Sequence, residues 1–287
     1  MSAPPAVAVV GAGGMLGYAV AEYFGRTGAP VIAVGRQQFD IARDPIAKLE
    51  RLVGPAGSII NCAGVIKPMI ARTSVEDVLR VNTVFPHNLA QLGLRLDKPV
   101  FHVTTDCVYS GSRGGYDESD LFDADDLYGL SKNGGDFANA MVLRTSIIGE
   151  ERGTGRSLLE WARSQRGQAV SGFLNHRWNG VTTLHLAEVV HRIVEEGLYR
   201  RGLFHVYSPA VVTKFELLDL INQVYGLNLT IRPVEAPSAC DRSLASRHDL
   251  SRRLCVKSLR QQLDDMRQFF AAPAADAHPH SEHLSRP

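Results

Sequence analysis

The sequence has few cysteines, and none of them is spaced as in a metal site or a disulfide framework. The 287 residues contain no Cys-x-x-Cys pair, and the four cysteines are scattered at Cys62, Cys107, Cys240 and Cys255. This spacing argues against a cysteine-based zinc site and indicates a reducing compartment. We therefore expect no metal and a cytoplasmic location.

An excess of charge and a long hydrophobic run are also lacking. Thirty-one basic residues against 30 acidic ones give a formal charge of +1, so no overall field favours nucleic acid or an anionic membrane. No apolar run approaches the ~20 residues that span a bilayer, and the first five residues lack the charged segment of a signal peptide. A hydrophobic content of 45% fits an ordinary globular protein. We expect a soluble protein that binds neither nucleic acid nor membrane.

A glycine-rich turn follows the first predicted strand. Ala6 to Val10 is a valine-rich apolar run, typical of a parallel strand buried on both faces. Gly11-Ala12-Gly13-Gly14-Met15-Leu16-Gly17 then opens a helical pattern that extends to Arg26. Amides at a helix N-terminus bind phosphate, so strand, glycines and helix together predict a pyrophosphate site. A glycine-rich turn that serves only tight packing is the alternative.

The second predicted strand, Val31 to Gly35, leads to Arg36. This position lies about twenty residues beyond the glycines, where a dinucleotide fold meets the adenosine ribose. An arginine there can pair with a 2′-phosphate, whereas an acidic residue prefers a free 2′-hydroxyl. Arg36 therefore favours NADP(H), with NAD(H) and an exposed loop arginine as alternatives.

Two later predicted strands, 57–61 and 99–103, flank a predicted helix over 73–96 that carries Asn82. Thr104 and Thr105 follow the second of these strands, at the sheet edge where open α/β folds place their chemistry. Because successive residues of an extended chain point in opposite directions, we expect one threonine to face the site.

Tyr128 and Lys132 stand four residues apart at the predicted start of a helix. Residues i and i+4 share a helical face, so the ammonium can stabilise a tyrosinate and lower the phenol pKa from its reference of about 10. Tyr128 is therefore a candidate general acid. The alternative is a lysine lying beside an exposed ring. The segment 110–127, with five aspartates, is predicted to be a mobile loop with a solvated surface.

Taken together, these motifs resemble the extended short-chain dehydrogenase/reductases, and among them the dTDP-4-dehydrorhamnose reductase (RmlD-like) group. The family's order is kept across about the first 150 residues by the glycine turn, Asn61-Cys62-Ala63-Gly64, Thr104-Thr105-Asp106-Cys107-Val108-Tyr109, Tyr128-x-x-x-Lys132 and Leu143-Arg144-Thr145-Ser146. The resemblance implies an α/β fold, a Rossmann doubly wound parallel sheet with a smaller C-terminal substrate-binding lobe.

The resemblance also implies roles for the matching residues. Tyr128 would protonate a carbonyl oxygen, Thr105 would hydrogen-bond the same oxygen, and Lys132 would hold the nicotinamide ribose and depress the tyrosine pKa. Tyr128 and Lys132 would thus also contact the cofactor. The other implied cofactor contacts are Gly11, Gly14 and Gly17 with the amides of Met15 and Leu16 at the pyrophosphate, Asp40 and Ile41 at the adenine, Ala63 and Gly64 at a ribose, and Asn82.

The chain departs from its relatives at two places. Related dehydratases carry Thr-Asp-Glu where this chain has Thr105-Asp106-Cys107, and a thiol of ordinary pKa does not replace that carboxylate as a base. This disfavours dehydration and leaves reduction or epimerisation. The RmlD-like group is expected to carry Asp-Gln-x-Gly-x-Pro-Thr where this chain has residues 177–183, Arg-Trp-Asn-Gly-Val-Thr-Thr.

Periodicity in the second half predicts helices over 157–166, 184–196, 214–225 and 254–270, and a strand over 204–207. We assign 1–150 to an NAD(P)-binding domain, 151–270 to a substrate lobe with elements that return to the sheet, and 271–287 to a disordered tail. The tail carries His278, His280 and His283, which we do not interpret as a metal site. Candidate substrate residues are Thr104, the cations Arg177, Arg242 and Arg247 for a diphosphate, and Trp178 for stacking.

These features favour an NAD(P)H-dependent reductase of a nucleotide-linked 4-keto-6-deoxysugar. Two alternatives stay open, a nucleotide-sugar C4 epimerase with bound NAD and a non-catalytic NADP-binding regulatory subunit. The expected partner is the nucleotide-sugar substrate, and a homodimer is left open.

Overall fold

The structure is a computed structural model that describes residues 4–151, 155 and 157–272 of the chain. Six parallel strands form the central sheet in the order β10-β5-β4-β3-β1-β2. Their bounds are β1 Val7–Val10, β2 Val31–Val34, β3 Ser58–Asn61, β4 Val100–Thr105, β5 Met141–Thr145 and β10 Gly202–His205. The order reverses between β1 and β3, and at such a switch point a doubly wound sheet opens a crevice for ligands.

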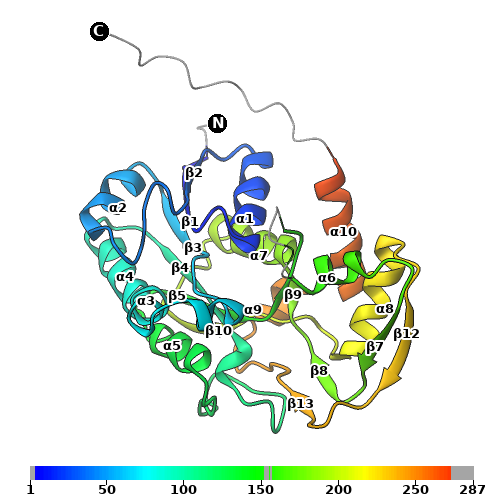
Figure 1. The fold of residues 1–287 in the computed structure, drawn as a ribbon. Coiled ribbons are helices and arrows are strands. Elements are labelled where there is room, and N and C mark those ends of the chain that lie inside the picture. The colour runs from blue at the N-terminus through cyan, green and yellow to red at the C-terminus, as the bar shows by residue number, and fades with distance from the viewer. Residues whose placement is uncertain (1–3, 152–154, 156, 273–287) are drawn as a thin grey trace.

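Helices cover both faces of this sheet (Figure 1). Helices α1 (Met15–Arg26) and α7 (Thr183–Glu195) pack on one face, and α2 (Ile46–Val53), α4 (Phe85–Arg95) and α5 (Leu127–Gly135) lie on the other. Alternate residues of β1 enter the two cores, as a strand buried on both sides requires. The predicted α/β fold with a doubly wound parallel sheet is confirmed.

The helix predicted over 73–96 is divided into three parts. It consists of α3 (Val75–Leu79), a π-helical turn η2 (Arg80–Val84) and α4. Pro86 lies in the first turn of α4, where a missing amide hydrogen is tolerated. π turns insert one extra residue into a helix and often occur at functional sites.

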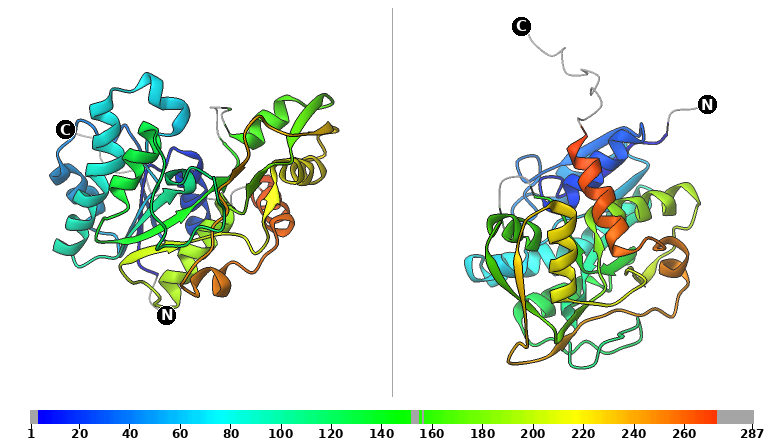
Figure 2. Two further views of the ribbon diagram at one scale, coloured as in Figure 1. Left: turned by 90° about the horizontal axis from the view of Figure 1, so that it is seen from below. Right: turned by 90° about the vertical axis from the view of Figure 1, so that its right-hand side faces the viewer.

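Most of the strands after residue 146 leave the central sheet and build a second lobe beside it (Figure 2). Strand β7 (Ala169–Phe173) pairs with β12 (Thr230–Val234), and β8 (His176–Trp178) lies between β11 (Val212–Thr213) and β13 (Cys240–Asp241). Helices α6 (Leu158–Ser164) and α8 (Lys214–Tyr225) pack with these strands around a third core. A short pair, β6 (Ile147–Ile148) and β9 (Val181–Thr182), links this region to the end of β5.

The closing helix predicted over 254–270 is wrong in its first part. Helix α9 (Leu250–Leu254) ends there, and α10 (Leu259–Ala271) begins separately. Ser258 and Gln261 form a capping box that fixes the start of α10, so the chain turns between the two helices. The tail was predicted over 271–287, but Ala271 still belongs to α10. From residue 273 onward the predicted tail, including its three histidines, lies outside the described residues.

The segment 110–127 is a loop without a helix or strand until α5, as predicted. Its acidic side chains, however, are not all solvated at the surface. Tyr116 stacks on Tyr109 with ring centroids 4.2 Å apart. Glu118 is half-buried and accepts hydrogen bonds from the amide of His205 at 2.9 Å and from the hydroxyl of Ser246 at 2.5 Å. The loop is therefore tied to the second half of the chain.

No helix among the described residues is both long and apolar enough to cross a bilayer.

Candidate active site

Two adjoining cavities of about 590 and about 790 Å³ lie at the carboxyl edge of the central sheet. They share a wall formed by the glycine turn after β1 and the segment after β3. Residues common to both linings are Gly13, Gly14, Cys62, Ala63, Gly64 and Met69. Two connected chambers on either side of a glycine turn suit the two halves of a dinucleotide.

The glycine turn needs its glycines. Gly11 has a φ of +83°, and a Cβ there would stand 2.7 Å from the amide nitrogen of Ala63. A Cβ on Gly17 would collide with the carbonyl oxygen of Gly11. Gly14 caps α1 without any side-chain hydrogen bond, so the amides that open α1, including those of Met15 and Leu16, lie uncapped at the cavity wall. This uncapped terminus fits a pyrophosphate.

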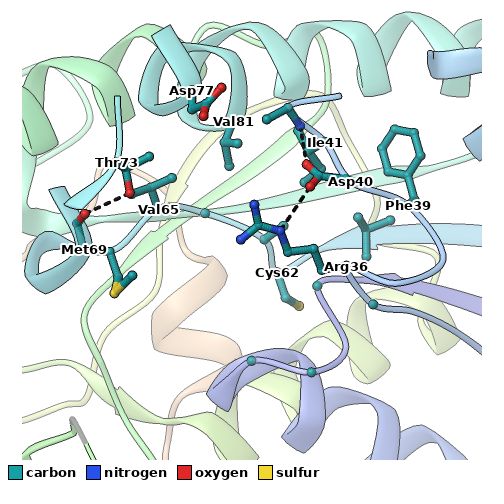
Figure 3. Close-up of a pocket in the computed structure, with 18 of the residues that line it drawn as sticks. Arg36, Phe39, Asp40, Ile41, Cys62, Val65, Met69, Thr73, Asp77 and Val81 are labelled. Carbon is teal, nitrogen blue, oxygen red and sulfur yellow. Dashed lines mark hydrogen bonds and ion pairs between the residues drawn. The ribbon is translucent and has the colours of Figure 1, made fainter. Parts of the chain in front are cut away.

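The predicted adenosine residues Arg36, Asp40 and Ile41 line the smaller cavity (Figure 3). Arg36 Nε donates to Asp40 Oδ2 at 3.2 Å, while 84% of the Arg36 side chain stays exposed. The other Asp40 oxygen accepts from the amide of Ala42 at 2.9 Å. The arginine thus stands at the mouth with its terminal nitrogens available to a phosphate. Sequence reasoning missed Arg72 and Ser74, which also line this cavity and follow no predicted strand.

The larger cavity brings the three predicted catalytic residues together. Thr105 ends β4, while Tyr128 and Lys132 lie in α5, whose start is fixed because Asp126 accepts from the amide of Gly129 at 2.7 Å. The Thr105 hydroxyl accepts from the amide of Cys107 at 3.1 Å and donates to Asp106 Oδ1 at 3.3 Å. Its interaction with Tyr128 opposes the rise of the phenol pKa and connects the two elements.

The electrostatics at Tyr128 differ from the prediction. Burial raises its pKa well above the usual value, and the neighbouring Cys107 and Asp106 act in the same direction. Lys132 was expected to lower the phenol pKa, but burial outweighs any such effect. Burial also lowers the pKa of Lys132 to about 8, against a weaker opposing effect of Asp136. At neutral pH the site therefore holds a protonated phenol and an ammonium.

The ammonium of Lys132 lies against the segment after β3. A Cβ on Gly64 would collide with Lys132 Nζ, so a larger residue at that position would displace the ammonium. Within the described ranges no hydrogen bond from this ammonium is recorded, and it is available to ribose hydroxyls. Ala63 and Gly64 line both cavities, as predicted.

Asn82 was predicted to contact the cofactor, but the structure places it behind the cavity wall. Its side chain is fully buried, accepts from the amide of Val65 at 2.8 Å and donates to the Ser131 hydroxyl at 3.1 Å. The π turn points it between the segment after β3 and α5. Asn82 therefore positions these two walls relative to each other.

Thr104 lines the larger cavity but is buried, and its side chain interacts with Asp136 beneath the sheet edge. Asp136 accepts from Arg144 at 2.6 Å, and Arg144 also donates to the Tyr109 hydroxyl at 2.7 Å. Arg144 is fully buried, so this pair ties α5 to β5. The expectation that one threonine faces the site is met by Thr105.

The predicted substrate residues of the second lobe are divided by strand alternation. Arg177 on β8 is exposed and lines neither cavity, while Trp178 is only 4% exposed and packs in the core of the lobe rather than offering a stacking face. Arg247 is also outside both linings. Arg242 is half-buried, donates to the carbonyl of Tyr109 at 2.7 Å and acts electrostatically on Asp106 and Cys107. Arg242 also lines neither cavity.

Comparisons with known proteins agree with this geometry. The family model described as the RmlD substrate binding domain matches residues 6–272. A dTDP-4-dehydrorhamnose reductase of Mycobacterium tuberculosis is 28% identical over 242 residues, covering 79% of this chain and 78% of that protein. A dTDP-4-keto-6-deoxy-D-glucose reductase of Streptomyces niveus is 25% identical, covering 93% and 97%. The structure of a Bacillus anthracis dTDP-4-dehydrorhamnose reductase in complex with NADP has a similar fold, with a TM-score of 0.77, 20% identity and coverage of 92% and 99%.

Proposed function

Because the chain belongs to the RmlD substrate binding domain family, we propose that it is an NAD(P)H-dependent reductase of a nucleotide-linked 4-keto-6-deoxysugar, acting in deoxysugar biosynthesis. The observation that carries this proposal is the meeting of Thr105, Tyr128 and Lys132 in a cavity continuous with the glycine cradle.

The residues present fit a nicotinamide dinucleotide. The uncapped start of α1 would hold the pyrophosphate, Asp40 and Ile41 the adenosine, and Lys132 with Ala63 and Gly64 the ribose of the reactive half. The exposed guanidinium of Arg36 favours a 2′-phosphate and hence NADP(H), with NAD(H) as the alternative. Bound there, the reduced nicotinamide supplies a hydride to the substrate ketone.

Tyr128 holds the proton that completes the alcohol. Its raised pKa keeps the phenol protonated at neutral pH, and the alkoxide that develops on the ketone oxygen is a stronger base than a phenolate. Thr105, which interacts with Tyr128, would orient the phenol and contact the same substrate oxygen. The ammonium of Lys132 adds positive charge near this developing anion.

Cys107 separates this site from a dehydratase. Burial raises the pKa of its thiol to about 12, so it stays protonated and does not remove a proton from the sugar. Its place at the end of β4 is where the dehydratase motif carries a carboxylate. Reduction without loss of water is the chemistry that these residues support.

The test is the consumption of NADPH in the presence of dTDP- and UDP-linked 4-keto-6-deoxysugars, with the product identified by mass spectrometry. A product two mass units heavier than the ketone, formed with one NADPH consumed, supports the proposal. Interconversion of C4 isomers without net NADPH consumption would indicate an epimerase. Binding of NADPH without turnover, together with a stoichiometric copurifying protein, would indicate a regulatory subunit.

The proposal also covers the oligomeric state, the cellular location and the division into domains. Exposed apolar side chains at Val84, Leu130 and Phe137, on or beside the adjacent helical elements η2 and α5, suit a homodimer interface. Light scattering of the wild type and of Phe137→Asp tests this. Four unpaired cysteines suit a cytoplasmic location. The small sheets β11-β8-β13 and β12-β7 suit a separate substrate lobe.

A further inference from the structure

Residues 66–73, here called the strap, follow β3 and border both cavities. The strap consists of the short 3₁₀ helix η1 (Lys67–Arg72) between two extended residues, Ile66 and Thr73, and none of the helix residues is buried. The Thr73 hydroxyl donates to the carbonyl of Met69 at 2.9 Å and so ties the helix to its own end (Figure 3). A segment with so little buried surface belongs to the least stable part of a fold. Its cavity-lining residues are Ile66, Lys67, Pro68 and Met69 in the larger cavity and Met69, Arg72 and Thr73 in the smaller one.

Both ends of the strap are anchored to the body of the protein. Before it, the amide of Val65 donates to Asn82 Oδ1 at 2.8 Å, and the carbonyl of Val65 accepts from Asn82 Nδ2 at 3.1 Å. After it, the Ser74 hydroxyl caps α3 by accepting from the amide of Asp77 at 3.1 Å. The strap is therefore a short helical piece held between two fixed points, with an extended residue as a joint at each end.

An ion pair joins the strap to α5. Lys67 Nζ lies 2.5 Å from Asp126 Oδ2, while the other oxygen of Asp126 accepts from the amide of Gly129 and caps the helix. Both partners of the ion pair are partly exposed, 56% for Lys67 and 41% for Asp126, so the pair can break and form again at little cost. Because α5 carries Tyr128, the strap is fastened to the element that positions the candidate acid.

We propose that the strap closes over a bound dinucleotide and that the ion pair between Lys67 and Asp126 is its latch. This inference rests on the proposed function, because the dinucleotide is the ligand that both cavities would share. Ile66 lines the larger cavity with 42% of its surface exposed, and a bound cofactor would cover this apolar surface. Release of the cofactor then requires the strap to lift, which breaks the ion pair. Lys67 thus acts on the cofactor through the strap and Asp126, as a positioning residue.

The experiment measures how fast NADPH leaves the protein. Stopped-flow fluorescence follows the displacement of NADPH by excess NADP+ from wild type, Lys67→Met and Asp126→Asn. Asparagine caps a helix as well as aspartate does, so Asp126→Asn removes the charge and keeps the cap of α5. We expect each variant to release NADPH about two- to fivefold faster than wild type, because an exposed ion pair contributes little.

The two positions should act as one unit. The double variant should release NADPH no faster than either single variant, because removing one partner already removes the whole ion pair. Lys67→Arg should match wild type. Sodium chloride at about 0.5 M should speed release from wild type and not from Lys67→Met or Asp126→Asn, since salt screens an exposed pair.

Arg80→Met is the matched control, because Arg80 is 55% exposed, pairs with Glu76 and lines neither cavity. Equal acceleration in this variant would mean a general charge effect and would overturn the proposal. Acceleration in Lys67→Met without any in Asp126→Asn would mean that Lys67 contacts the cofactor directly, and this too would overturn the latch.

Unchanged release in Lys67→Met and Asp126→Asn would overturn the strap while leaving the proposed function intact. No binding of NADPH or NADH to wild type would overturn both. If Asp126→Asn does not fold, Asp126→Ser, which also caps a helix, takes its place under the same criteria. Release of NADPH that depends on the latch in a protein that reduces no sugar nucleotide would refute the proposed function and leave the strap standing.

Discussion

Replacing Lys132 by methionine should make the protein more stable while abolishing its reductase activity. Lys132 is only 6% exposed, and burial lowers its pKa from 10.5 to about 8. That difference corresponds to about 3 kcal/mol of destabilisation whenever the ammonium is charged in the folded state. Methionine keeps a chain of similar length and volume but carries no charge. We therefore expect the free energy of unfolding of Lys132→Met at pH 7 to exceed that of wild type by up to about 3 kcal/mol.

The pH dependence identifies the cause. A lysine whose folded pKa is depressed destabilises the fold fully below about pH 8, and this penalty disappears as the pH rises toward 10.5. The advantage of Lys132→Met over wild type should therefore shrink between pH 8 and 10.5. Urea unfolding at several pH values measures this difference in the free energy of unfolding. Lys48→Met, which removes only a surface partner of Asp44, should leave the free energy of unfolding nearly unchanged. A Lys132→Met variant that is less stable than wild type at pH 7, or an advantage independent of pH, would refute this reasoning.

Three further predictions concern single positions. Arg144→Met should lower the free energy of unfolding by about 3–5 kcal/mol, because it leaves the Asp136 carboxyl buried without its partner; a loss below 1 kcal/mol in urea unfolding would contradict this. Gly17→Ala should abolish NADPH binding measured by fluorescence, since its Cβ meets the Gly11 carbonyl, whereas Gly25→Ala in the same helix meets nothing and should bind normally. Arg36→Ala should raise the Kd for NADPH about 10-fold and leave that for NADH nearly unchanged; an unchanged ratio of the two would show that Arg36 does not recognise the 2′-phosphate.

Features set by local sequence were predictable. The glycine turn and the four-residue spacing of Tyr128 and Lys132 each act over one helical turn, and the structure places them as expected. The strand predicted over 99–103 was found because a buried parallel strand gives a largely apolar run, although β4 continues through Thr104 and Thr105. Short-range rules therefore located the centre of the candidate site.

Features set by tertiary packing were not predictable. The pKa of Tyr128 depends on burial and on Cys107 from another element, and these outweigh the neighbouring lysine. Asn82 faces inward because a π turn alters the helical phase, which periodicity does not reveal. Arg177 is turned outward and Trp178 is buried because β8 pairs with two short strands far away in the sequence, a pairing that periodicity does not reveal.

The central claim is that Tyr128 supplies the proton as hydride reaches the sugar ketone. The most direct measurement is transfer of deuterium from NADPH deuterated at nicotinamide C4 to the sugar carbon of a 4-keto-6-deoxysugar nucleotide, followed by mass spectrometry in wild type and Tyr128→Phe. We expect one deuterium per product in wild type, and a rate reduced at least 100-fold in the variant with its NADPH affinity retained. Transfer at the wild-type rate in Tyr128→Phe, or no transfer in wild type, would contradict the account.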